Sequence, residues 1–256
     1  MKITIAKDQN ELGRMAGQTA AELIRKSIAE KGYANIILAT GASQFETLHQ
    51  LINEPVEWSR VTMFHLDEYI ELPVTARASF RKYLQERFLV NVPPLKAIYL
   101  IDGENDAAAE CEKLNDIIKD HPIDVALVGI GENGHLAFND PPADFDTEEP
   151  FIIVDLDKKC REQQLAEGWF DSLEEVPRQA ISMSIQQIMK SKHIICSVPG
   201  SRKAATVKDC LEKPVSNLYP ASILRLHSDC NYFLDKESSA MVSPEVIESI
   251  EGIKVK

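Results

Sequence analysis

The sequence predicts one α/β domain of three layers, in which helices cover both faces of a mostly parallel, Rossmann-like twisted sheet. Short runs rich in β-branched residues alternate along the chain with segments of helical spacing. Such alternation is typical of β-α-β units, whose strands are parallel. The chain has 256 residues, which is enough for one such domain and short for two. We therefore expect a single domain over residues 1–256, with a C-terminal tail from about residue 237.

The expected elements follow one another in a regular order. Apolar residues at helical spacing predict a long first helix over 9–31. Further helices are expected at 45–53, 79–89, 106–119, 183–190 and 201–212. Strands are expected at 35–39, 61–66, 97–101, 123–130, 193–198, 223–227 and 231–234. In such a sheet, ligands bind beyond the carboxyl ends of the strands, so the residues that follow each strand are the candidates for a site.

Composition and charge exclude several classes of function. The formal net charge is −12, and an acidic surface repels nucleic acid, so we expect no nucleic-acid partner. No apolar run reaches the roughly 18–20 residues of a membrane span, and the N-terminus turns polar too early for a signal peptide. We therefore expect no membrane contact and a cytoplasmic location. Monomer and homo-oligomer both stay open.

The five cysteines show neither a disulfide framework nor a metal-binding motif. No CxxC occurs, and no cysteine has a metal-ligand spacing with a histidine. We interpret all five as ordinary buried or surface thiols and expect none to be a nucleophile. They are Cys111, Cys160, Cys196, Cys210 and Cys230.

Two loops that follow predicted strands have the features of an anion site. The segment Thr40-Gly41-Ala42-Ser43 joins a strand to a helix, and a helix N-terminus offers free N–H groups to a phosphate. The segment Gly200-Ser201-Arg202-Lys203 repeats this pattern and adds two cations, which an acidic protein needs to hold an anion. The alternative at both places is an ordinary capped turn.

Two adjacent carboxylates, Asp67 and Glu68, follow the second predicted strand. Buried carboxylates are unfavourable unless they are paired or hydrogen-bonded. A carboxylate beside a sugar carbon can act as a base, and the charge of its neighbour would raise its pKa. The alternative is a solvated turn.

The segment GIGENGHLAFND at 129–140 is the most specific part of the sequence. Three glycines within six residues predict an unusual backbone there. His135 lies between Asn133 and Asp140, and a nearby carboxylate can fix the imidazole tautomer and support its charged form. This makes His135 a candidate proton carrier, although a loop-capping role is the alternative. We expect no metal, because HxH and HExxH arrangements are missing.

These segments together resemble the glucosamine-6-phosphate deaminase family, which shares its fold with 6-phosphogluconolactonases. The resemblance covers residues 2–236 and rests on Asp67-Glu68-Tyr69, on GIGENGHLAFNDP at 129–141, on PGSRKA at 199–204 and on PAS and LRLH within 220–227. It implies that a hexosamine 6-phosphate and water give a ketose 6-phosphate, normally fructose 6-phosphate, and ammonia. It also implies that no metal or organic cofactor takes part.

The resemblance further implies a role for each candidate residue. His135 would assist ring opening by relaying a proton at the ring oxygen, and Asp67 would move a proton from C2 to C1. Glu68, Asn133 and Asp140 would order this proton traffic. The substrate and its phosphate would contact Thr40, Gly41, Ala42, Ser43, Gly134 and Lys203.

The chain departs from the family pattern at several positions. Asn133 stands where aspartate is common, and Asp140 stands where glutamate is common, so we expect Asp140 to reach His135 only through water. No arginine matches the family's additional phosphate contact near Gly168, and Arg161 is the candidate replacement. The stretch 143–152 lacks basic residues, so we expect no activation by N-acetylhexosamine 6-phosphate.

Four alternative functions stay open. A 6-phosphogluconolactonase is disfavoured because those sequences tend to carry arginine where Tyr69 stands and Thr-Ala-Ser after the histidine. A deaminase of galactosamine 6-phosphate is equally compatible with the residues. A non-catalytic sugar-phosphate sensor would need a DNA-binding module, for which the sequence shows no sign. A catalytically inactive member is the last alternative, although Asp67 and His135 are both present.

Overall fold

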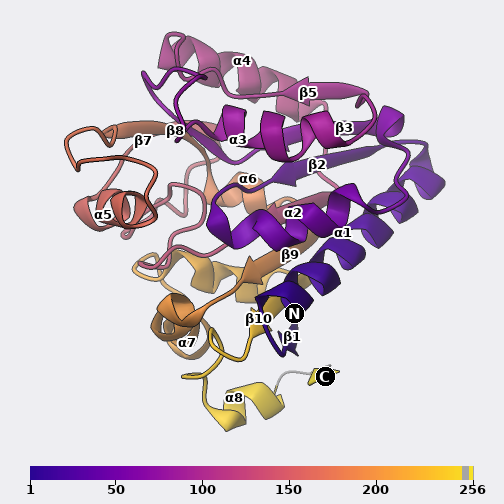
Figure 1. Ribbon diagram of the computed structural model, residues 1–256, viewed down its shortest axis with the longest axis vertical. Helices are drawn as coiled ribbons and strands as arrows, with labels where there is room; N and C mark the ends of the chain where they lie inside the picture. Colours follow the sequence, from indigo (N-terminus) through magenta and orange to yellow (C-terminus); the bar gives the residue numbers. More distant parts are fainter. Residues whose placement is uncertain (250–253, 256) are drawn as a thin grey trace.

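Parallel strands form the centre of the computed structural model, which describes residues 1–249 and 254–255. The strands are β1 (Lys2–Ala6), β2 (Ala34–Leu38), β3 (Val61–His65), β5 (Ala97–Tyr99), β6 (Val125–Val128), β9 (His193–Val198), β10 (Cys230–Asp235) and β11 (Lys254–Val255). Their order across the sheet is β11-β1-β10-β9-β6-β2-β3-β5 (Figure 1). The chain runs from β2 through β3 to β5 in one direction and then returns to β6 on the other side of β2. The order therefore reverses between β2 and β6, the place where α/β sheets bind ligands.

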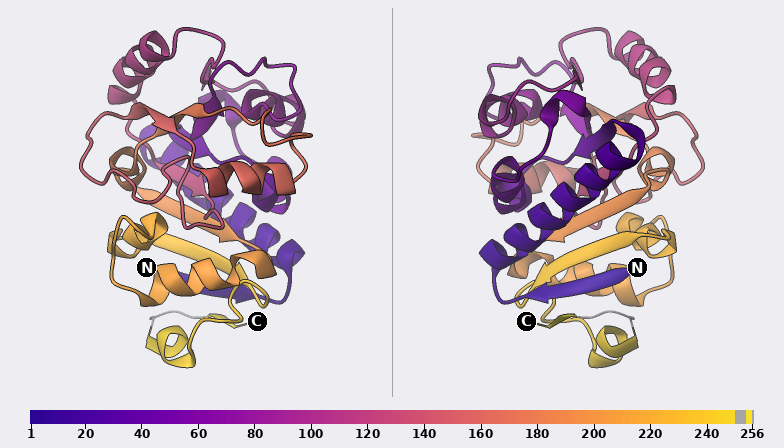
Figure 2. Two further views of the ribbon diagram at one scale, coloured as in Figure 1. Left: turned by 90° about the vertical axis from the view of Figure 1, so that its left-hand side faces the viewer. Right: turned by 90° about the vertical axis from the view of Figure 1, so that its right-hand side faces the viewer.

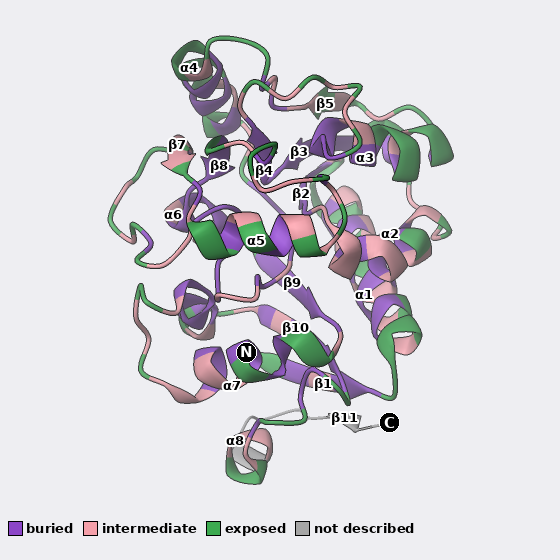
Figure 3. Cartoon of the chain, turned by 60° about the vertical axis from the view of Figure 1, so that its left-hand side comes forward, coloured by how far each residue is buried: buried purple, intermediate pink, exposed green. Residues whose placement is uncertain are grey.

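Helices cover both faces of this sheet (Figure 2). One face packs against α1 (Gln9–Lys31), α2 (Phe45–Ile52) and α3 (Phe80–Arg87). The other face packs against α4 (Ala107–Lys119), α6 (Ile185–Met189) and α7 (Ala204–Glu212). The main strands are mostly buried, and exposed residues gather on helices and loops (Figure 3). These layers confirm the predicted three-layer α/β fold and its mostly parallel sheet.

A second, antiparallel sheet lies beside the main one and holds the candidate base. It consists of β4 (Asp67–Tyr69), β8 (Gln179–Met183) and β7 (Phe151–Asp155), in that order. The ring of Tyr69 is fully buried and contacts Phe80, Phe138 and Phe170. This aromatic cluster fixes β4, and therefore Asp67, against the end of the main sheet.

The sequence prediction missed several elements and misassigned one. It did not contain β1, β4, β7, β8 or α5 (Lys158–Ala166). The strand expected at 223–227 is wrong, because residues Pro220–Leu226 form a 3₁₀ helix. Proline is well suited to the start of a helix, and a short buried apolar run does not distinguish a strand from a helix.

The end of the chain contains one further helix, α8 (Pro244–Ser249), within the C-terminal tail expected from residue 237. Residues 250–253 and 256 of that tail lie outside the described residues. Over the described ranges, every helix is too short or too polar to span a bilayer.

Candidate active site

A cavity of about 360 Å³ opens where the order of the main sheet reverses. Its walls come from the loops that follow β2, β6 and β9, from the start of β4, and from α5. Seven residues predicted from the sequence line it: Thr40, Gly41, Ala42, Ser43, Asp67, His135 and Lys203. The structure thus brings together four segments that are far apart in the sequence.

Two similar turns form one end of the cavity. Gly41 has φ 89° and Gly200 has φ 90°, a backbone conformation that favours glycine. Each glycine is followed by one 3₁₀ turn, Ala42–Gln44 or Ser201–Lys203, which leads directly into α2 or α7. Apart from the two chain neighbours, no described residue has an atom within 4 Å of a Cβ built on either glycine, so a ligand can approach both backbones closely. Two helix starts that face one cavity make a suitable anion cradle.

Lys203 supplies positive charge to this cradle. Its side chain is buried, and burial lowers the pKa of its amino group, an effect that the negative charges of Glu167 and Glu132 oppose. Within the described part of the chain, no carboxylate lies within 4 Å of its Nζ, whereas Arg202 pairs with Glu132 at 3.4 Å. Lys203 is therefore free to pair with an anionic ligand.

Asp67 lies at the cavity with an unsatisfied carboxylate. It is 7% exposed, and none of the described residues donates a hydrogen bond to its side chain. Burial, and then the charge of Glu68, raise the pKa of Asp67 well above its usual value. A carboxylate in this state is a stronger base than an ordinary aspartate once it is ionised.

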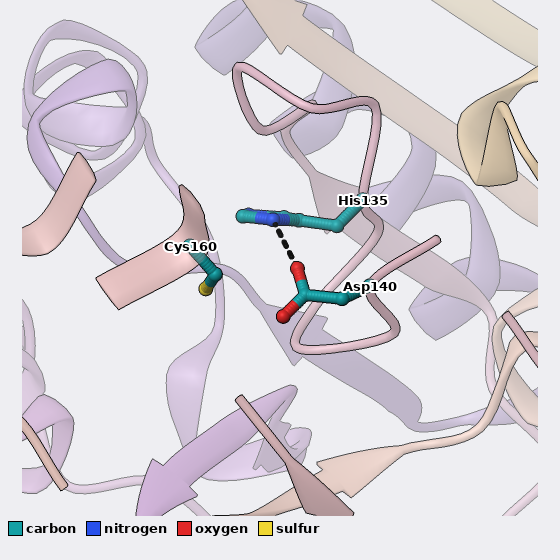
Figure 4. A group of neighbouring side chains, drawn as sticks. All are labelled: His135, Asp140 and Cys160. Carbon is teal, nitrogen blue, oxygen red and sulfur yellow. Dashed lines mark hydrogen bonds and ion pairs between the residues drawn. The ribbon is translucent and has the colours of Figure 1, made fainter. Parts of the chain in front are cut away.

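His135 lines the same cavity, and its ring is hydrogen-bonded to Asp140, which is not a lining residue (Figure 4). Nδ1 of His135 lies 3.0 Å from Oδ1 of Asp140. Oδ1 also accepts a bond from Nδ2 of Asn133 at 2.9 Å, and Oδ2 accepts the N–H of Asp157 at 3.1 Å. Burial would raise the pKa of Asp140, but the bonds from His135, Asn133 and Asp157 outweigh it and lower that pKa. An ionised Asp140 only accepts, so Nδ1 carries the proton and the lone pair lies on Nε2.

This geometry corrects the expectation that Asp140 reaches His135 only through water, and it shows how Asn133 is bonded. Asp140 contacts the imidazole directly and not through water, despite its short side chain. Asn133 does not bond the ring: its Oδ1 accepts the backbone N–H of His135 at 3.1 Å, and its amide supports Asp140. Asn133 therefore positions the pair without contacting the cavity.

The ring of His135 packs directly on the backbone of Gly131. A Cβ built on Gly131 would lie 2.2 Å from Nε2 of His135, and the N–H of Gly131 donates to the carbonyl of His135 at 3.0 Å. Only glycine leaves room for the ring in this orientation.

Glu68 and Gly134 were predicted as site residues and do not line the cavity. Glu68 points away from it and caps the first turn of α3, where it accepts the N–H groups of Phe80 at 3.2 Å and Arg81 at 2.9 Å. The carbonyl of Gly134 accepts the N–H of Ala221 at 2.9 Å, so this glycine anchors the loop to the 3₁₀ helix behind it.

Arg161 was the expected replacement for a missing phosphate ligand, and the structure contradicts this. Its guanidinium donates to the carbonyls of Leu173 and Val176, which fastens the loop that follows α5. Arg202 lines the cavity instead. Its place after a strand-end Gly-Ser pair was the signal that identified it as a cation of the second turn.

Three polar residues in α5 or at its C-terminal end line the cavity and were not among the predicted site residues. Gln163, Gln164 and Glu167 line it, and Glu167 accepts bonds from Nε2 of Gln163 at 2.8 Å and from Nε1 of Trp169 at 3.1 Å. Polar residues at spacing i and i+4 mark one face of a helix, but the position of that helix depends on the fold.

Comparisons with known proteins agree with this geometry. The profile of the family "Glucosamine-6-phosphate isomerases/6-phosphogluconolactonase" matches residues 7–232. A glucosamine-6-phosphate deaminase of Streptococcus pyogenes serotype M1 is 37% identical over 243 residues, which are 94% of this chain and 100% of that protein. One from Lactobacillus delbrueckii subsp. bulgaricus is 34% identical over 244 residues, again 94% of this chain and 100% of the relative.

Solved structures show the same relationship. A monomeric glucosamine-6-phosphate deaminase of the NagB superfamily superposes with a TM-score of 0.85 at 31% identity, over 94% of this chain and 100% of that one. The 6-phosphogluconolactonase of Trypanosoma brucei superposes with a TM-score of 0.78 at 18% identity, over 94% and 98%, and shares the fold. The chain therefore belongs to the glucosamine-6-phosphate isomerase/6-phosphogluconolactonase family.

Proposed function

We propose that the protein converts glucosamine 6-phosphate and water to fructose 6-phosphate and ammonia. The observation that carries this proposal is one cavity that holds an unpaired buried carboxylate, an imidazole whose Nδ1 is bonded to a carboxylate and a cationic anion cradle. The names of the relatives support the same reaction.

The cradle holds the phosphate of the substrate. The two helix starts at Gly41 and Gly200 supply N–H groups, and Lys203 supplies the positive charge that the acidic protein otherwise lacks. Fixing the phosphate at this end orients the sugar carbons toward Asp67 and His135, and such positioning is itself a large part of catalysis.

His135 opens the sugar ring. With its Nδ1 proton held by Asp140, Nε2 takes the proton of the C1 hydroxyl and returns it to the ring oxygen as the C1–O5 bond breaks. The ionised Asp140 stabilises the imidazolium between these two transfers.

Asp67 then carries out the isomerisation. Its carboxylate takes the proton from C2 of the open aldose and delivers it to C1, while O1 gains a proton that the amino group releases, so that the amino aldose becomes a ketose imine. Water then adds across the imine C=N bond to give a carbinolamine. A proton passes from its hydroxyl to the nitrogen, and ammonia leaves with the electron pair of the C–N bond as the C2 carbonyl forms. Burial shifts the pKa of Asp67 upward, toward neutral pH, and a general base is most effective when its pKa is near the working pH.

One panel of assays tests this function. Ammonia release from glucosamine 6-phosphate is measured beside ammonia release from galactosamine 6-phosphate and hydrolysis of 6-phosphogluconolactone. We expect ammonia from glucosamine 6-phosphate. Preferential release from galactosamine 6-phosphate would show that this sugar phosphate is the substrate instead. Lactone hydrolysis without ammonia would replace the proposed reaction by that of the related branch.

A small-molecule sugar phosphate is the proposed partner. A cytoplasmic location and independence from nucleic acid, membrane and metal stay predictions.

A further inference from the structure

Cys160 lies beside the His135–Asp140 pair (Figure 4). The thiol belongs to the first turn of α5, whereas His135 and Asp140 belong to the loop after β6. One nitrogen, one carboxylate oxygen and the sulfur of these three residues lie within 4.8 Å of one another. Because Cys160 follows His135 by 25 positions, no spacing rule for metal ligands could detect this group.

The three side chains match the ligand preferences of Zn²⁺. Thiolate sulfur, imidazole nitrogen and carboxylate oxygen are its usual donors, and three protein ligands leave a fourth position for water. One thiolate and one carboxylate balance the charge of a divalent ion. Mg²⁺ and Ca²⁺ prefer oxygen ligands and are disfavoured by the sulfur and the nitrogen.

We propose that His135, Asp140 and Cys160 bind Zn²⁺ reversibly and that the metal-bound enzyme is inactive. On binding, Cys160 releases its proton to solvent, and the imidazole donates its one lone pair to the ion. If the ion is held by Nδ1, the ring proton moves to Nε2. In either case His135 has no lone pair left to relay a proton, and Asp140 is diverted from the ring.

The binding half of the proposal is tested without any activity measurement. Cd²⁺ is added to the purified full chain, and the ultraviolet absorption of the cadmium–thiolate bond is followed. We expect a saturable band that Cys160→Ser removes and that Cys111→Ser, a matched change at a buried cysteine of α4, leaves in place. His135→Gln should weaken binding about tenfold or more. A band that survives in Cys160→Ser would overturn the proposal.

The inhibition half rests on the proposed function. Ammonia release is titrated with Zn²⁺ and, as a hard-cation control, with Mg²⁺. We expect Zn²⁺ to inhibit the wild type and to require an about tenfold higher concentration or more in Cys160→Ser. If Zn²⁺ inhibits the wild type and Cys160→Ser at the same concentration, or if Zn²⁺ activates the enzyme, the inactive metal-bound state is refuted. If the metal-free wild type releases no ammonia but still shows the Cd²⁺ band, the proposed function alone is refuted.

Discussion

Asp67 and Glu68 are neighbours in β4, yet their side chains belong to two different regions of the molecule. Asp67 faces the cavity, where none of the described groups hydrogen-bonds its carboxylate. Glu68 is 0% exposed and faces the start of α3, where it accepts N–H groups of Tyr69, Phe80 and Arg81 and the hydroxyl of Ser79.

The difference shows how one strand separates stability from chemistry. Burial raises the pKa of both carboxyls, but hydrogen bonds oppose this effect only at Glu68. The bonded carboxylate closes the N-terminus of a helix, where free N–H groups need an acceptor. The unbonded carboxylate keeps its lone pairs for a substrate. Variants at the two positions should therefore fail in different ways.

The largest effect is expected for Asp67→Asn. An amide cannot take the C2 proton, so ammonia release should fall by roughly 10²–10⁴-fold, the usual contribution of a general base. Binding of glucosamine 6-phosphate, measured by calorimetry, should be retained, because the phosphate cradle is untouched. A variant that releases ammonia at the wild-type rate would show that Asp67 is not the base.

Glu68→Gln should act on stability. The amide retains one acceptor oxygen but places an NH₂ group against backbone donors, which leaves buried N–H groups unpaired. We expect a loss of about 1–3 kcal/mol in the free energy of unfolding, measured with urea. The KM of the folded enzyme should stay close to that of the wild type. A catalytic defect as large as that of Asp67→Asn, with unchanged stability, would contradict the separation of the two regions.

The sequence alone could predict the carboxylate pair but not the direction of each side chain. The repeated order of strands and helices was sufficient for the three-layer fold, because the periodicities of both elements are local. Asp67 and His135 were identifiable because loops after parallel strands meet at one edge. The antiparallel β4 was not visible in the sequence, since three residues carry no periodic signal. Successive side chains of a strand point to opposite faces, so β4 itself, and not the residue type, sends Asp67 and Glu68 in different directions.

Contacts between distant segments were also beyond the sequence. Gln163, Gln164 and Glu167 reach the cavity only because α5 folds over it, and Cys160 meets His135 for the same reason. Arg161, the next residue, instead donates to the carbonyl of Leu173 in the loop that follows α5. The orientation of a helix cannot be predicted from its residues when the segments that pack against it are unknown, particularly when few apolar residues mark one face.

The pH dependence of stability sharpens the comparison at Asp67. Its pKa is raised in the fold, so the folded state binds the proton more tightly than the unfolded state, and ionisation costs stability. This cost is absent below the unfolded value of 3.8 and grows as pH rises from there toward the folded pKa. Asp67→Asn should therefore be more stable than the wild type at neutral pH, with a difference in melting temperature that shrinks on acidification. A difference that grows at low pH would mean that the carboxylate is stabilised in the fold.

The smallest effect is expected for Glu104→Gln, which tests whether Glu68 depends on the other partners of Arg81. Arg81 lies 3.3 Å from Glu68, 2.7 Å from Asp102 and 3.0 Å from Glu104, whose side chain is 46% exposed. The Glu104 end of this pair is open to solvent, which screens the charges, so we expect the pair to contribute about 0–1 kcal/mol. The amide oxygen of the variant can still accept from Arg81. The free energy of unfolding, measured with urea, should therefore fall by no more than about 1 kcal/mol, and ammonia release should be unchanged. A loss equal to that of Glu68→Gln would instead make the whole Arg81 network, and not the capped helix start, the source of stability on this side of β4.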